Sequence, residues 1–203
     1  MNSTILPVHI CFKGERDYLH GTDIYESLAQ AANTQFERAV VRFQMSIHRF
    51  FSLQPEIHWF ETGHLTARPR NAVVDFSISS NNRGAAGWLV ETDRPVDCRV
   101  PYDEDKIGRH CTFTDSCISI QGDSGYRPIE VVVSMTKQLH NRILRAQAGR
   151  WIFTKLDMRR LLEPLDATTF TVSLKENLHN RLTKSEITVG NESIGMIYFS
   201  LVR

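Results

Sequence analysis

Apolar residues recur at helical spacing in two segments, one in each half of the 203-residue chain. Residues three and four positions apart share a helix face, so both segments are predicted to form amphipathic helices. The apolar face of the first helix would consist of Ile24, Leu28, Ala31 and Ala32. That of the second would consist of Val132, Met135, Leu139 and Ile143.

Alternating apolar and polar residues predict β-strands in both halves, for example in VVDFSIS (73–79) and FTVSL (170–174). The segments SNNRG and GNES lie between alternating runs, and their Asn and Gly residues are typical of hairpin turns. Residues 93–112 are rich in Pro and Asp and are predicted to link two units, 1–92 and 113–203.

The two halves also align with each other. FKGERDYLHGTDIYESLAQAAN lies over IQGDSGYRPIEVVVSMTKQLHN without a gap, which pairs Gly14 with Gly122 and Tyr18 with Tyr126. RFQMSIHRFF over FTKLDMRRLL, and then the two hairpin segments, follow in the same order at an offset of roughly 110 residues. This predicts an α+β fold of two related units in a pseudo-twofold arrangement. The alternative is that any two α+β segments of similar periodicity would align equally well.

The segment around the first helix resembles the central helix of hotdog-fold β-hydroxyacyl-carrier-protein dehydratases. In that family a His-Phe-x-Gly loop precedes a helix with Glu-Ala-Leu-Ala-Gln; here Phe12-Lys13-Gly14 matches the loop and Glu26–Gln30 matches the helix. Cys11 stands in the place of the family's catalytic histidine, and Ser134 takes the place of Glu26 in the second half. The resemblance implies a double hotdog, in which two central helices are each wrapped by an antiparallel sheet. More distantly, VPYDEDKIGRH is similar to the linker of double-hotdog proteins of the A-factor biosynthesis family.

The resemblance implies an enzyme that acts on an acyl thioester, either acyl-CoA or acyl carrier protein, in fatty-acid or polyketide-type biosynthesis. Thioester hydrolysis or acyl transfer fits the residues better than dehydration, because a cysteine at position 11 needs a lowered pKa for acid–base work at neutral pH. The alternative is a non-catalytic acyl-binding or partner subunit of a biosynthetic complex. We expect no cofactor, and a double hotdog leaves open whether two chains form a homodimer.

Glu26 and His20 are the candidate catalytic residues. Glu26 would activate water or attack the thioester carbonyl, and His20 would carry a proton, because histidine titrates near neutral pH. Alternatively, Glu26 forms a capping box with Asp23, where the helix dipole favours a carboxylate. The candidate substrate-binding residues are Arg16, Asp17, Tyr18, Gly21, Tyr126 and Ser134.

Charge and cysteine content narrow the classes of function. The formal net charge is +1 and no basic run is present, so we expect no nucleic-acid partner. Without an apolar leader or a long apolar segment, we expect no membrane span and a cytoplasmic location. The four cysteines are expected to be free thiols, not a disulfide framework. No metal is expected, because the cluster that is close in sequence lacks a C-x-x-C knuckle; it consists of Cys98, His110, Cys111 and Cys117.

Overall fold

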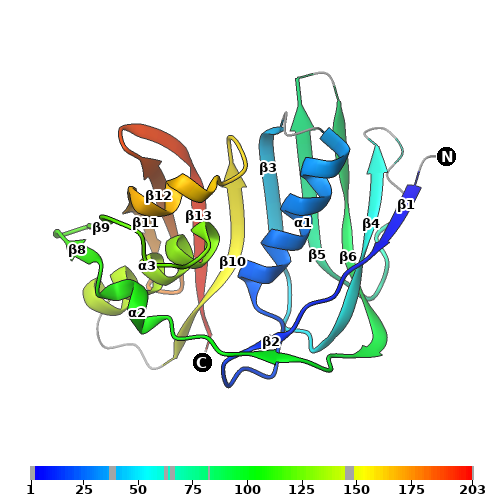
Figure 1. The fold of residues 1–203 in the computed structure, drawn as a ribbon, viewed down its shortest axis with the longest axis horizontal. Coiled ribbons are helices and arrows are strands. Elements are labelled where there is room, and N and C mark those ends of the chain that lie inside the picture. Colours follow the sequence, from blue (N-terminus) through cyan, green and yellow to red (C-terminus); the bar gives the residue numbers. More distant parts are fainter. Residues whose placement is uncertain are drawn as a thin grey trace. The chain divides into compact units, whose positions relative to one another are not determined.

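The computed structural model describes residues 3–36, 40–61, 64, 67–81, 83–144 and 149–202. The chain divides into two compact units, Met1–Tyr102 with Arg159–Leu161, and Asp103–Met158 with Leu162–Arg203. The boundary after Tyr102 falls inside the segment that the sequence predicts as a linker. Each unit combines one long helix with antiparallel strands, which confirms the α+β class (Figure 1).

The first unit is built from five antiparallel strands and the helix α1 (Gly21–Phe36). The strands follow the spatial order β1-β4-β6-β5-β3. Their bounds are β1 Ser3–Pro7, β3 Val40–Ile47, β4 Leu53–Glu61, β5 Ala72–Ser80 and β6 Gly84–Pro95. Two short strands, β2 (Phe12–Lys13) and β7 (Arg99–Val100), pair in parallel beside them. Figure 1 shows α1 lying across one face of the strands, and all four residues of its predicted apolar face are buried.

The second unit repeats the plan of a helix on antiparallel strands, with α3 (Pro128–Ile143) as the helix. The strands follow the order β10-β13-β12-β11-β9-β8. Their bounds are β8 Cys111–Phe113, β9 Cys117–Ile120, β10 Arg150–Met158, β11 Phe170–Leu178, β12 Leu182–Val189 and β13 Glu192–Val202. Two short helical segments, α2 (Asp105–Gly108) and the 3-10 helix η1 (Pro164–Thr168), complete this unit. On the predicted apolar face of α3, Val132, Met135 and Leu139 are fully buried and Ile143 is half-buried.

The two units place their matching hairpins in opposite orientations. In the first unit, β5, the first strand of the hairpin, lies beside the strand that follows the helix, β3. In the second unit it is β13, the second strand of the hairpin, that lies beside β10. The expectation of a pseudo-twofold repeat is therefore wrong in its strand order. A tight turn at residues 179–181 makes β12 a neighbour of β11, whereas β4 and β5 are further apart in the sequence and are not neighbours in the sheet.

The core of the second unit contains a histidine that has no hydrogen-bond partner among the described residues. His140 of α3 is fully buried, with its ring centroid 4.8 Å from that of Trp151 and 5.2 Å from that of Phe199. Burial lowers the pKa of His140 from 6.5 to about 4, because the imidazolium would lose its hydration. The side chain is therefore neutral in the folded protein at neutral pH.

We expect acid to destabilise the fold through His140. Between the unfolded pKa of 6.5 and the folded pKa of about 4, the unfolded chain binds a proton at His140 that the folded chain does not bind. The free energy of unfolding is therefore unaffected by this group above pH 6.5 and falls as the pH decreases from 6.5 to about 4. From about pH 7 to about pH 5, the free energy of unfolding should fall by about 2 kcal/mol through this group. Urea denaturation at both pH values should show this loss in the wild type and in the exposed control His110→Gln, but not in His140→Leu. Equal pH dependence in all three proteins would contradict the prediction.

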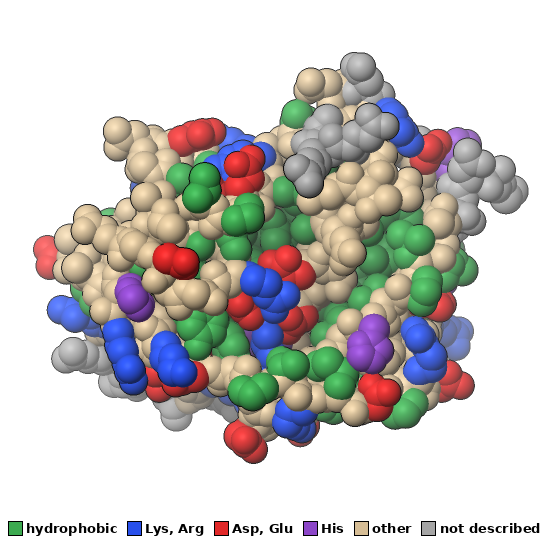
Figure 2. Space-filling model, in the orientation of Figure 1, with side chains coloured by type: hydrophobic (Ala, Val, Ile, Leu, Met, Phe, Trp, Pro, Cys, Tyr) green, Lys and Arg blue, Asp and Glu red, His purple; other side chains and the backbone are tan. Residues whose placement is uncertain are grey.

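Charged side chains of both signs are interspersed on the face drawn in Figure 2, with hydrophobic side chains between them. Of the helices in the described part of the chain, none has the length and apolar character needed to span a membrane. The expectations that the protein has no nucleic-acid partner and no membrane partner remain predictions.

Candidate active site

A buried lysine lies where α1 begins. Lys13 of β2 is only 3% exposed, and its Nζ donates a hydrogen bond to Thr22 Oγ1 at 2.9 Å. The same Nζ lies 3.0 Å from Asp23 Oδ1 in the first turn of the helix. A buried charge is retained when it is paired and hydrogen-bonded, so Lys13 and Asp23 hold β2 against the start of α1. No sequence pattern marks Lys13 as buried, because its burial depends on contacts with residues further along the chain.

His20 immediately precedes α1 and forms its cap through the backbone. Its carbonyl oxygen accepts hydrogen bonds from the amides of Asp23 (3.0 Å) and Ile24 (3.2 Å). Its side chain is buried, with Nδ1 2.7 Å from Thr22 Oγ1. Thr22 Oγ1 thus accepts a hydrogen bond from Lys13 Nζ and also shares one with His20 Nδ1, in which the donor depends on the tautomer of His20. Thr22 therefore links the His20 ring to the Lys13 ammonium at the start of α1.

Tyr102 lies against this cluster. Its ring centroid is 4.9 Å from Lys13 Nζ, 5.4 Å from the Arg16 guanidinium carbon and 5.6 Å from the centroid of the His20 ring. Gly14 has a φ of +53°, which favours glycine, and a Cβ there would lie 3.4 Å from the Tyr102 carbonyl oxygen. Tyr102 thus fixes the loop that carries Arg16, one of the predicted substrate-binding residues. The sequence placed Tyr102 in a linker and did not indicate this role.

The other predicted residues of this loop have different environments. Tyr18 packs against Phe50 with ring centroids 4.5 Å apart, whereas Asp17 is exposed. Gly21 is the first residue of α1, and its amide has no hydrogen-bond partner among the described residues. A helix start presents such amides with a partial positive charge, so this amide can polarise a carbonyl oxygen.

Glu26 lies in the second turn of α1, not at its cap. The helix begins at Gly21, so Asp23 is inside the first turn and its carboxylate pairs with Lys13. The interpretation of Asp23 and Glu26 as a capping box is therefore wrong, because it required Asp23 to precede the helix. Glu26 is half-buried and lies four residues after Thr22 on the same helix face. Helical side chains lean toward the N-terminus, so Glu26 is directed toward the turn that carries Thr22.

Ser134 and Tyr126 of the second unit bind the backbone that precedes α2. Ser134 Oγ donates to the Glu104 carbonyl oxygen at 3.2 Å and accepts a hydrogen bond from Gln138 Nε2 at 3.0 Å. The Tyr126 hydroxyl donates to the Asp103 carbonyl oxygen at 2.7 Å. Both side chains thus stabilise the packing of this backbone segment on the region of α3, and their predicted contact with substrate remains a prediction.

The expectation of four free cysteines is wrong for Cys11 and Cys98, which form a disulfide. Their Cα atoms lie 4.8 Å apart although they are 87 positions apart in the sequence. The parallel pairing of β2 with β7, which sets Phe12 opposite Arg99, brings the preceding residues together. In this oxidised form Cys11 cannot serve as a nucleophile or an acid. Cys98 is also removed from the candidate metal cluster, whose other cysteines, Cys111 and Cys117, are free thiols.

Each unit packs one helix on antiparallel strands, and this arrangement can be compared with the folds of known proteins. Comparison with protein-family models and with curated proteins gives no match. The chain is similar to the solved dehydratase domain of PpsC from Mycobacterium tuberculosis in complex with C12:1-CoA, with 9% identity and a TM-score of 0.53 over 98% of this chain and 94% of that one. It is also similar to a protein described as a thioesterase II from Thermobifida fusca, with 10% identity and a TM-score of 0.50 over 100% and 93% of the two chains. Both are hotdog-fold proteins, so the chain has the hotdog fold, as the resemblance implied.

Proposed function

We propose that this protein is an enzyme that acts on an acyl thioester, either acyl-CoA or acyl carrier protein, by hydrolysis or acyl transfer in fatty-acid or polyketide-type biosynthesis. The observation that carries the proposal is the hydrogen-bond chain from Lys13 through Thr22 to His20, which holds the His20 ring at the start of a central helix. The hotdog fold supports the substrate class, since a structure similar to this chain contains C12:1-CoA. We further propose a double hotdog, with one central helix in each unit, in a cytoplasmic protein.

In the proposed mechanism the thioester carbonyl oxygen accepts hydrogen bonds from the Gly21 amide and from His20 Nε2. These donors stabilise the negative charge that develops on the oxygen when the carbonyl carbon is attacked. Glu26 removes a proton from water, or from the hydroxyl group that receives the acyl chain, and the resulting oxygen nucleophile attacks. The C–S bond then breaks, and the departing thiolate takes the proton that Glu26 had removed, so that the thiol leaves and the Glu26 carboxylate is restored. Lys13 takes no proton in this scheme, because its role is to orient Thr22 and, through it, His20.

Dehydration is less well supported than hydrolysis or transfer. Removal of water from a β-hydroxyacyl group needs a base for the α-proton and an acid for the departing hydroxyl group. The residue in the place of the family's catalytic histidine, Cys11, is held in a disulfide with Cys98 and can do neither in that form.

A second candidate function is that of a non-catalytic acyl-binding or partner subunit. The observation that favours it is the burial of the cluster: Lys13 is 3% exposed, and Thr22 is fully buried with both of its hydrogen-bond partners inside the protein. Such a network also stabilises a fold without any chemistry.

Turnover of a panel of acyl-CoA and acyl-carrier-protein thioesters, followed by release of free thiol or by mass spectrometry of the acyl product, tests the proposal. We expect His20→Ala to lower kcat/KM by about 100-fold, because it removes one donor to the developing oxyanion. The exposed histidine variant His110→Gln should retain wild-type activity. No turnover of any thioester by the wild type, combined with tight binding of acyl-CoA, would instead support the acyl-binding function.

A further inference from the structure

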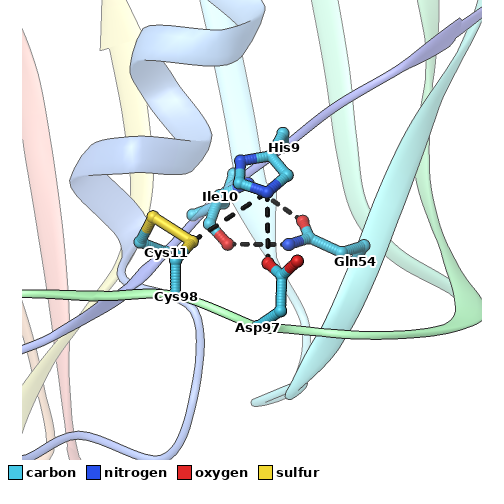
Figure 3. Close-up of a disulfide and its surroundings, with 6 residues drawn as sticks. All are labelled: His9, Ile10, Cys11, Gln54, Asp97 and Cys98. Atoms are coloured by element: carbon cyan, nitrogen blue, oxygen red, sulfur yellow. Dashed lines mark hydrogen bonds and ion pairs between the residues drawn. A yellow bond between two sulfur atoms is a disulfide. The ribbon is translucent and has the colours of Figure 1, made fainter.

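The disulfide is part of a compact group of metal-ligating side chains (Figure 3). The ligand atoms of His9, Cys11 and Cys98 all lie within 4.8 Å of one another. His9 Nε2 is 4.0 Å from Cys98 Sγ and 3.2 Å from Asp97 Oδ1. Two sulfurs and one imidazole nitrogen therefore converge from two chain segments, residues 9–11 and 97–98, and the Asp97 carboxylate adjoins them through His9. None of these four side chains takes part in the proposed acyl chemistry.

The donor set and its dimensions fit a tetrahedral zinc-type site. Such sites use thiolate, imidazole and carboxylate ligands at about 2.0–2.3 Å from the ion, so neighbouring ligand atoms lie roughly 3.3–3.8 Å apart along the tetrahedron edges. The distances from His9 Nε2 to Asp97 and to Cys98, 3.2 Å and 4.0 Å, lie close to this range. The two sulfurs, which are bonded to each other in the disulfide, must separate, and reduction of the disulfide allows this. The pairing of two cysteines with one histidine is typical of zinc, not of magnesium or calcium.

Bonds other than the disulfide hold both segments in place. Gln54 is 3% exposed, and its amide binds both the backbone nitrogen and the carbonyl oxygen of Ile10, each at 2.9 Å. Ile10 lies between the two proposed ligands His9 and Cys11, so the two hydrogen bonds with Gln54 position both. On the other side, the Phe12 amide donates to the Cys98 carbonyl oxygen at 3.0 Å. Since these bonds do not involve the sulfurs, we expect the backbone of the two segments to keep its position when the disulfide is reduced.

We propose that Cys11 and Cys98 in their reduced form, together with His9 and Asp97, bind a zinc-type divalent cation, and that the disulfide is the oxidised, metal-free form of this site. A dithiol reductant transfers two electrons to the Cys11–Cys98 bond and becomes a disulfide itself, which leaves two thiols on the protein. Binding of the ion releases the two thiol protons to solvent. His9 and Asp97 are 67% and 75% exposed, so the ion reaches the site from solvent. The sequence led us to expect no metal. Under this proposal, that expectation holds for the oxidised protein but not for the reduced protein.

Titration of the phosphine-reduced, oxygen-free protein with Co2+ alone tests the site, because thiolate ligands give Co2+ a charge-transfer band and tetrahedral geometry gives it strong visible bands. We expect one Co2+ per chain, displaced by Zn2+, and no such bands in the oxidised protein. Cys98→Ser should lose the bands or weaken binding by about 100-fold. The matched control, Cys111→Ser with Cys117→Ser, should keep both the bands and the stoichiometry.

Absence of thiolate bands in the folded, reduced wild type would overturn the proposal, as would bands that persist in Cys98→Ser and disappear in the Cys111→Ser, Cys117→Ser control. Circular dichroism establishes that each variant is folded. If Cys98→Ser is unfolded, Asp97→Asn replaces it, since an exposed side chain is not needed for folding, and it should weaken Co2+ binding by about 10-fold. Unchanged Co2+ affinity in Asp97→Asn would exclude the carboxylate from the site. Thioester turnover is not a readout here, so the proposed enzyme function is tested separately.

Discussion

Replacement of Lys13 by methionine should lower the free energy of unfolding by about 3 kcal/mol. The variant keeps the length of the side chain but removes the cation that faces Asp23, and loss of one member of a buried ion pair costs about 3–5 kcal/mol. We expect the lower end of this range because Asp23 is 14% exposed and so retains some hydration. Urea denaturation followed by tryptophan fluorescence measures the effect.

An exposed ion pair provides the control for Lys13→Met. Lys106 Nζ lies 3.8 Å from Asp103 Oδ2, and the two side chains are 58% and 49% exposed. Lys106→Met should therefore lower the free energy of unfolding by less than about 1 kcal/mol. The double variant Lys13→Met, Asp23→Asn should lose less free energy of unfolding than the two single variants lose in total, because the two charges are removed together. Additive effects, or equal costs at positions 13 and 106, would show that the pair does not hold β2 to α1.

Replacement of Glu26 by glutamine should lower kcat/KM for thioester substrates by about 100- to 10,000-fold, which is the contribution of a positioned general base. Glutamine keeps the shape of the side chain and its hydrogen-bonding capacity but cannot take a proton at neutral pH. Because Glu26 is half-buried on α1, the variant should fold normally, and thermal denaturation establishes this. A single-turnover assay with the thioester that the wild type processes fastest measures the chemical step.

Glu15→Gln is the matched control for Glu26→Gln, since Glu15 is exposed in the loop before α1. It should change neither turnover nor stability. Full activity in Glu26→Gln would remove Glu26 from the mechanism, and a stability loss with unchanged kcat/KM would assign it a structural role.

Part of the site could be predicted from the sequence because it depends on local geometry. His20, Gly21 and Glu26 are close in sequence and are joined to one helix, so recognition of that helix was enough to place them near its start. Lys13 and Tyr102 could not be found in this way. Their position depends on the pairing of β2 with β7, two short strands about 87 residues apart that carry no alternating pattern.

The positions of the hairpins within each sheet also could not be predicted from the sequence. The segments 73–91 and 183–201 were expected to form similar hairpins, and both do, as β5–β6 and β12–β13. Which strand of each hairpin meets the strand after the helix differs between the units, since it depends on the connection that precedes the hairpin. The alternation of apolar and polar residues along a strand is the same whichever strand lies beside it, so the alternation does not reveal the strand order.

The sequence by itself determined the two amphipathic helices, the hairpins, the α+β class and the resemblance to hotdog proteins, because helical and strand periodicities are properties of neighbouring residues. Only the tertiary structure decided that Lys13 is buried against Thr22 and Asp23, that Cys11 is bonded to Cys98, and that the two units differ in strand order. These features join residues that are distant along the chain. Their partners are selected by strand pairing and packing, which leave no periodic signal at the individual residue.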